Sequence, residues 1–148
     1  MNQPTKSKTI ATWLAFLFGS LGLHRFYLRG WGDIWGWLHL PPTLLGAYGV
    51  QRMLEIGQDD RLAWALIPLL GLSIAASMLA AIVHGLTADE LWNARNNPAA
   101  APCTSGWGAV FGVLGALIIG ATVLIATIAF SGQRYFESQI VDARALSR

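Results

Sequence analysis

The sequence predicts an all-α, polytopic membrane protein with four transmembrane helices, and three observations support that fold class. Hydrophobic residues make up 54% of the 148 residues and charged residues only 12%, well below the charged share of an ordinary soluble domain. Four apolar stretches have lengths suited to membrane helices. Tryptophan residues gather near the ends of these stretches, where the headgroup region of a bilayer favours indole rings.

The four apolar stretches are separated by short loops. They span Thr9–Leu23, Trp31–Val50, Leu62–Leu86 and Gly106–Phe130. The last two easily reach the ~20 residues of a crossing helix, whereas the first does so only if it continues to Leu28 with its basic and aromatic side chains at the headgroup level. Continuous apolarity without alternation argues against the strands of a membrane barrel. No small-residue cleavage site follows the first stretch, so we expect a retained helix and not a signal peptide.

Five of the seven tryptophans support these boundaries. Four of them open predicted helices, and the fifth lies just beyond the third helix: Trp31, Trp35, Trp64, Trp107 and Trp92. An indole ring combines an apolar body with a polar N–H group and therefore prefers the membrane–water interface. Their positions fit four spans.

The most distinctive segment reads GLHRFYLRG and runs from Gly22 to Gly30. It is predicted to form a tight turn between the first two helices, because glycine permits a sharp reversal. A basic side chain here can reach lipid phosphates, and the aromatic side chains can anchor at the interface. The candidate interaction residues are Gly22, His24, Arg25, Phe26, Tyr27 and Gly30.

This segment resembles the signature of the two-transmembrane-helix domain (TM-two domain) family, a helical hairpin whose connection carries a Gly-x-His-Arg-Phe-Tyr-Leu-Gly-like motif. The resemblance covers Lys8–Val50. Arg29 stands where the family usually has glycine. The second helix carries Pro41 and Pro42 and lacks the acidic residue that the family often has near the end of this helix. The resemblance implies membrane residence and contact with a protein or lipid, without an established reaction. Its members often have the motif loop on the cytoplasmic side.

Together these features predict a four-helix, bacterial-type variant of the family with four parts. These are an N-terminal cytoplasmic segment (1–8), the two-helix hairpin (9–54), two further transmembrane helices (55–130) and a C-terminal tail (131–148). The tail has apolar residues at near-helical spacing, which fits either a helix on the membrane surface or a solvated helix.

Two polar residues lie in or beside the second span and form a possible intramembrane polar site. His39 is about midway along it, where an ionisable group is a candidate for function. The alternative, favoured by the sequence, is that a neutral imidazole bonds carbonyl groups freed by the two following prolines. Asp33 follows Arg29 by four residues, a spacing that favours an ion pair on a helix.

Small residues recur every four positions in the fourth predicted helix, at Gly108, Gly112, Ala116 and Gly120. Small side chains let helix backbones approach closely in lipid. We therefore expect this face to pack against another helix, either of the same chain or of a second copy.

Several classes of function lack support in the sequence. A single cysteine, Cys103, cannot build a cysteine-rich metal shell, and no nucleotide, zinc-protease or hydrolase motif occurs. We expect no cofactor and no metal. The net charge of +2 comes from few ionisable groups without a dense basic cluster, so no nucleic-acid partner is expected.

Orientation is predicted from the basic residues of the loops. With four spans, both chain ends share a side with the loop 51–61, and that side holds seven of the ten Lys and Arg residues. The sequence thus predicts a multi-pass protein of the bacterial inner (cell) membrane with both termini in the cytoplasm.

The leading functional hypothesis is a non-enzymatic interaction or scaffolding protein. It would contact a partner protein or lipid headgroups through the His-Arg-Phe-Tyr segment, with membrane lipids and a protein partner or self-association as expected contacts. The alternative is a small oligomeric transporter or channel that uses His39 and a second helix kinked by proline. An enzyme is third, because no nucleophile–base or metal constellation is visible.

Overall fold

A computed structural model describes residues 4–146, with side chains through Ile140, and every regular element in that part of the chain is helical. The elements are α1 (Lys8–Phe18), η1 (Gly19–Leu21), α2 (Leu23–Arg29), α3 (Ile34–Trp37), α4 (Leu40–Ile56), α5 (Arg61–Leu86), α6 (Asp89–Asn96) and α7 (Trp107–Leu146). The all-α prediction is confirmed. Residues 1–3 and 147–148 of the predicted end segments lie outside the described residues.

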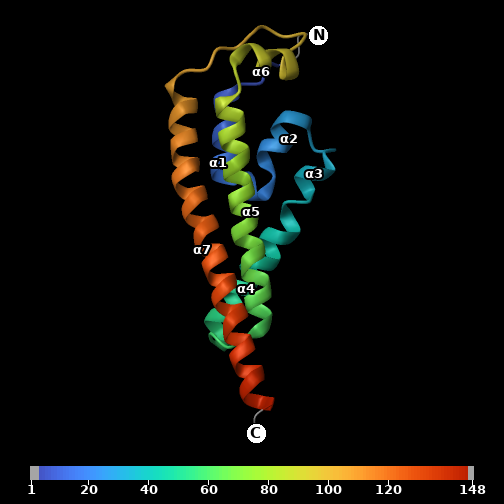
Figure 1. The fold of residues 1–148 in the computed structure, drawn as a ribbon. Helices are drawn as coiled ribbons and strands as arrows, with labels where there is room; N and C mark the ends of the chain where they lie inside the picture. Colours follow the sequence, from blue (N-terminus) through green and yellow to red (C-terminus); the bar gives the residue numbers. More distant parts are fainter. Residues whose placement is uncertain (1–3, 147–148) are drawn as a thin grey trace.

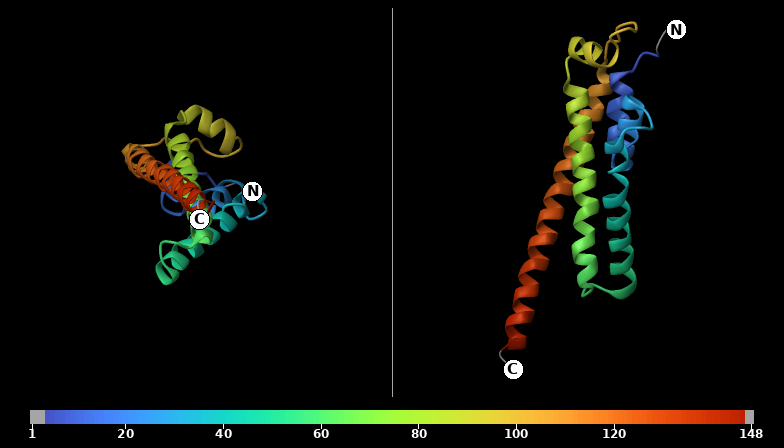
Figure 2. Two further views of the ribbon diagram at one scale, coloured as in Figure 1. Left: turned by 60° about the horizontal axis from the view of Figure 1, so that its bottom comes forward. Right: turned by 90° about the vertical axis from the view of Figure 1, so that its right-hand side faces the viewer.

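Two helices are long and apolar enough to cross a membrane. They are α5, with a mean hydropathy of 2.3, and α7, with a mean hydropathy of 2.5. Their starts agree with the predicted third and fourth spans to within one residue. The predicted tail, however, is not a separate segment, because α7 continues through Gly132 without a break to Leu146 and projects beyond the turn between α4 and α5 (Figure 2).

The first predicted span is not a full-length helix, and four spans are not confirmed. Helix α1 has 11 residues, a length of about 16 Å at 1.5 Å per residue. The chain then reverses through η1 and Gly22, and α2 returns along α1 (Figure 1). The return is held where the two helices meet again: the Tyr27 hydroxyl accepts from the Ser7 N–H at 2.8 Å, and the Lys6 ammonium donates to the Leu28 carbonyl.

Gly22 explains the reversal. Its φ of 78° lies in the left-handed region, which residues with a Cβ rarely adopt. A Cβ at this position would also lie 2.2 Å from the carbonyl oxygen of Gly36 in α3. Glycine is therefore required both by the turn and by the close approach of the next element.

The second predicted span is interrupted, as its prolines indicate. It begins as the single turn α3, breaks at Leu38 and His39, and continues as α4 with Pro41 and Pro42 in its first turn. Proline is tolerated there because the first N–H groups of a helix have no partner within it.

Three long segments lie antiparallel and form the body of the molecule. Helices α4 and α5 approach through Gly46, where a Cβ would lie 2.3 Å from the Leu70 backbone nitrogen. Helices α5 and α7 approach through Gly71 and Gly120, whose Cβ positions meet side chains of the facing helix. Such contacts between small residues suit helices in lipid, where the hydrophobic effect does not drive association.

The tip of the α1–α2 hairpin is buried about halfway along α5 and is satisfied by polar side chains. The Thr43 hydroxyl donates to the Ser20 carbonyl oxygen at 2.6 Å and lies 2.7 Å from the Ser73 hydroxyl. Gly19 packs on Ser77, which is fully buried. Non-helical backbone at membrane depth is tolerated only where protein covers it, and this arrangement provides that cover.

The first and last described residues lie at opposite ends of the bundle (Figure 1). The reason is the α1–α2 reversal, which returns the chain to the end where α1 begins before α3 and α4 run to the other end. Basic residues occur at both ends of the bundle. One end holds Lys6, Lys8, Arg29 and Arg95, whereas Arg52, Arg61 and Arg134 lie toward the other.

Candidate functional site

The motif that was expected to be a turn is itself a helix, α2, bounded by two glycines with positive φ. Gly22 precedes it and Gly30, with φ of 82°, ends it. Helix α2 runs back toward the start of α1 (Figure 1). Its side chains contact α3 on one side and line a cavity with the C-terminal half of α5 on the other. His24 and Phe26 of the motif are buried, whereas Arg29 is exposed, and the motif does not form the tip of a loop.

Phe26 fixes α2 against α3. It is only 8% exposed, and its ring lies 4.9 Å from that of Trp31 and 5.1 Å from that of Trp37. Gly36 has no room for a side chain, because a Cβ there would lie 2.5 Å from the Phe26 ring. This aromatic contact gives Phe26 a packing role.

Asp33 pairs with Arg25 and not with Arg29 as the spacing suggests. The Arg25 Nε donates to the Asp33 carboxylate at 2.7 Å. The other carboxylate oxygen accepts from the Trp35 N–H and caps α3. Arg29 is the last residue of α2, so the helical register that would bring it beside residue 33 does not exist.

Three histidines from distant parts of the sequence converge beside α2. The His24 ring centroid lies 5.5 Å from that of His39 and 5.7 Å from that of His84. The Nδ1 of His39 lies 2.7 Å from the Trp35 carbonyl oxygen and therefore donates to it. The Nδ1 of His24 and the Nε2 of His84 are buried and have no hydrogen-bond partner.

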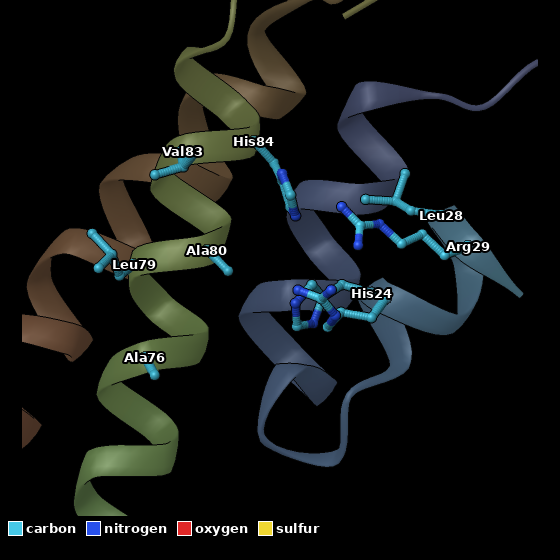
Figure 3. Close-up of a pocket in the computed structure, with 9 residues that line it drawn as sticks. His24, Leu28, Arg29, Ala76, Leu79, Ala80, Val83 and His84 are labelled. Carbon is cyan, nitrogen blue, oxygen red and sulfur yellow. The ribbon is translucent and has the colours of Figure 1, made fainter. Parts of the chain in front are cut away.

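A cavity of about 330 Å³ lies between α2 and α5 beside these histidines, and we call it the α2–α5 cavity. Its lining combines basic and imidazole groups with an apolar face of α5: His24, Arg25, Leu28, Arg29, Ala76, Leu79, Ala80, Val83 and His84. Figure 3 shows His84 reaching from α5 toward α2, with the head of Arg29 directed back toward α5. The sequence did not point to this site, because its lining comes from two helices far apart in the chain and because the spacing of Arg29 and Asp33 suggested an ion pair for Arg29.

A second cavity, of about 440 Å³, adjoins the first and reaches toward the end of the bundle. The two share Leu28, Arg29, Val83 and His84, and the second adds Lys6, Thr87, Trp92, Arg95 and Asn96. We call it the α6 cavity. The two together form one continuous positively charged region at the end of the bundle where α1 begins.

Helix α6 is tied over this end by a polar network. Lys8 pairs with Asp89 at 2.6 Å, and the hydrogen bond from Lys8, followed by those from Ser105, lowers the pKa of Asp89 to about 2. The Trp92 indole donates to the Lys6 carbonyl oxygen at 2.9 Å. Cys103, for which the sequence suggests no role, receives the Asn93 side chain at its carbonyl oxygen. These contacts hold α6, which forms the roof of the α6 cavity, in place.

The small residues of α7 pack against other helices of the same chain, α1 and α5. Gly108 and Gly112 lie against α1, where Thr9 and Thr12 are their nearest contacts, and Gly120 lies against Met78 of α5. Ala116 is fully buried in the core between them. Among the described residues, no group of His, Cys, Asp and Glu side chains has a geometry that could hold a metal ion.

Comparison with protein families supports the resemblance seen in the motif. Residues 4–51 match the model of the TM2 domain, the part of the chain that contains α1, η1, α2, α3 and most of α4. Comparisons with curated proteins and with solved structures find no similar protein. Together with the two long apolar helices, the match of residues 4–51 to the TM2 domain indicates a membrane protein.

Proposed function

We propose that this protein is a non-enzymatic, multi-pass membrane protein that contacts anionic lipid headgroups through its α2 segment. The single observation that carries the proposal is the convergence of Arg25, Arg29 and His84 on one cavity at the end of the bundle. Positive side chains at that depth attract the negatively charged headgroups of membrane lipids. The proposal narrows the expected interaction to lipid, whereas contact with a protein partner remains a prediction.

The proposed membrane arrangement has three crossings and a re-entrant hairpin. Helices α3 and α4 together, α5 and α7 would cross, while α1 and α2 would enter from one side and return to it. Large apolar side chains on the outer faces of these helices, such as Leu72, Ile118 and Ile125, are more than half exposed and would face lipid. We propose a bacterial inner membrane as the location of the protein.

The basic groups are arranged for headgroup contact. Arg29 is exposed, and neither Arg29 nor Arg95 has an acidic partner within 4 Å among the described residues. Trp31 is 69% exposed beside α2, and Trp107 is 75% exposed at the same end. Indole rings at this level would anchor the site in the headgroup region.

Lipid-dependent thermal unfolding of the purified protein tests the proposal. We expect phosphatidylglycerol added to detergent micelles to raise the Tm more than phosphatidylcholine does, and we expect salt to reduce this difference by screening. The double variant Arg29→Gln and Arg95→Gln should lose most of the difference. Arg61→Gln, which removes an exposed arginine at the opposite end of α5, is the matched control and should retain it. Equal stabilisation by both lipids would reject the proposal.

A second candidate function, a small transporter or channel, is favoured by one observation. His39, the intramembrane histidine of the broken second helix, lies beside His24, which in turn lies beside His84. Broken helices with polar groups often mark transport sites. Proteoliposomes would test this candidate: proton flux that disappears in His39→Ala would support it, and flux no greater than that of empty liposomes would eliminate it.

A further inference from the structure

We infer that the α2–α5 cavity is a site for one phospholipid molecule, with the lipid phosphate between Arg29 and His84 and an acyl chain along the α5 wall. The inference rests on the proposed contact with anionic headgroups. It goes further by placing a single lipid in a formed site, in place of a loose layer of lipids around the protein.

The basic part of the cavity presents donors from two helices. Arg29 comes from the end of α2 and His84 from the third-last residue of α5, and both line the two cavities. Arg25 lines the α2–α5 cavity as well, and its bond to Asp33 fixes the orientation of the guanidinium group. Arginine binds phosphate with paired, charge-assisted hydrogen bonds, so this end of the cavity suits a phosphate group.

His24 is the observation that points to a ligand. Its side chain belongs to a residue that is only 3% exposed, and its Nδ1 has no hydrogen-bond partner. The Nε2 of His84 is also buried without a partner, and both residues line the same cavity. Buried polar atoms without partners are costly and rare in proteins. The imidazole rings of both residues line the cavity, and a phosphate bound there would lie beside them.

The rest of the cavity is shaped for a hydrocarbon chain. Ala76, Leu79, Ala80 and Val83 recur at spacings of three and four residues and therefore form one stripe on α5. The two alanines leave the hollow, since any larger side chain there would occupy it. Inorganic phosphate has no use for such a wall, whereas a phospholipid has both a phosphate and a chain. We therefore assign the cavity to a lipid.

The adjoining α6 cavity selects the headgroup. Lys6 and Arg95 line it above the proposed phosphate position, and no Asp or Glu lines either cavity. A choline headgroup would bring its own positive charge toward these side chains, whereas the glycerol of phosphatidylglycerol would not. Like charges in a partly buried site repel, so the site should prefer phosphatidylglycerol to phosphatidylcholine.

Native mass spectrometry of the purified full chain, titrated with each lipid, tests the inference. We expect the wild type to retain one phosphatidylglycerol under activation that removes phosphatidylcholine. Arg29→Gln should weaken retention about tenfold, the effect of losing one charge-assisted hydrogen bond. Ala76→Leu should prevent retention of the lipid, because the larger side chain would fill the space proposed for the acyl chain. Its control, Ala65→Leu, places the same exposed substitution near the other end of α5 and should leave retention unchanged.

The possible outcomes separate the inference from the proposed function. If Ala76→Leu retains the lipid as wild type does, the site is not in the cavity and the inference is overturned, although headgroup preference in the unfolding assay still supports the proposed function. If inorganic phosphate raises the Tm of the wild type as strongly as the lipid does, the assignment to a lipid fails. If neither lipid is retained and neither raises the Tm differentially, both are wrong.

Discussion

Similar apolar sequences form different structures in two regions of the molecule. One region is the helix pair α5 and α7, and the other is the TM2 region before it, residues 4–51. Helix α5 runs unbroken for 26 residues, with Pro68 inside it, whereas residues 8–56 are divided among α1, η1, α2, α3 and α4. The unbroken helices carry mainly lipid-facing and packing residues. The broken region supplies two of the three clustered histidines and two of the basic groups of the α2–α5 cavity. Breaks in a membrane helix thus create the polar positions that a continuous helix lacks.

The largest expected effect contrasts a glycine of the broken region with a glycine of α7. Gly22→Ala places a Cβ in the left-handed region, which costs about 1–2 kcal/mol, and forces it against the Gly36 carbonyl oxygen. We expect a loss of several kcal/mol, seen as a large fall in Tm. Gly132→Ala is the control, because a Cβ at this position meets nothing within 4 Å. The substitution also replaces a glycine inside a helix, which should stabilise the protein by about 0.5–1 kcal/mol. Equal effects of the two changes would show that the reversal at Gly22 is not required.

This contrast also shows what the sequence predicts and what it does not. The starts of α5 and α7 follow from apolar length, and the break near Pro41 follows from proline chemistry. The reversal at Gly22 does not, because a glycine inside an apolar run is equally compatible with an uninterrupted membrane helix. The sign of its φ depends on tertiary contacts that a single sequence does not display.

The candidate site, too, could be predicted only in part from the sequence. The motif Gly22–Gly30 identified the correct segment, because basic and aromatic residues between apolar stretches are distinctive. Its partner His84 lies 60 residues from His24 in the chain, and only the antiparallel return of α5 brings them together. A signal was present in the sequence, in that His39 and His84 are both ionisable groups within apolar helices, but their contact with His24 depends on the hairpin.

Removing the hydrogen bond from Thr43 to the tip of the α1–α2 hairpin should have an intermediate effect on stability. Thr43→Val preserves shape but leaves the Ser20 carbonyl oxygen without its donor. We expect a destabilisation of about 1–2 kcal/mol, since bonds between membrane helices fall in that range or below it. Thr122→Val is the matched control, because Thr122 is exposed and its hydroxyl bonds only the Ile118 carbonyl of its own helix. Unfolding in detergent should separate the two variants, and an equal response would contradict the buried role of Thr43.

The smallest expected effect concerns pH at the α6 roof. The pKa of Asp89 is lowered from 3.8 to about 2 in the folded protein, so its ion pair with Lys8 contributes stability above the unfolded pKa. That contribution is lost as the pH falls through the folded pKa. The Tm of the wild type should therefore fall more steeply than that of Asp89→Asn between about pH 5 and about pH 2. Parallel curves would contradict the stabilising role of the pair.

The most direct test of the central claim, a re-entrant hairpin followed by three crossings, is the sidedness of the two chain ends. Cys103→Ser removes the single cysteine of the chain, and Thr5→Cys and Gln139→Cys then place a thiol on an exposed residue near each end. In sealed vesicles, a membrane-impermeant maleimide should label only one of the two variants, and the other should react only after the vesicles are opened. Labelling of both variants from the same side would contradict the account and restore an even number of crossings.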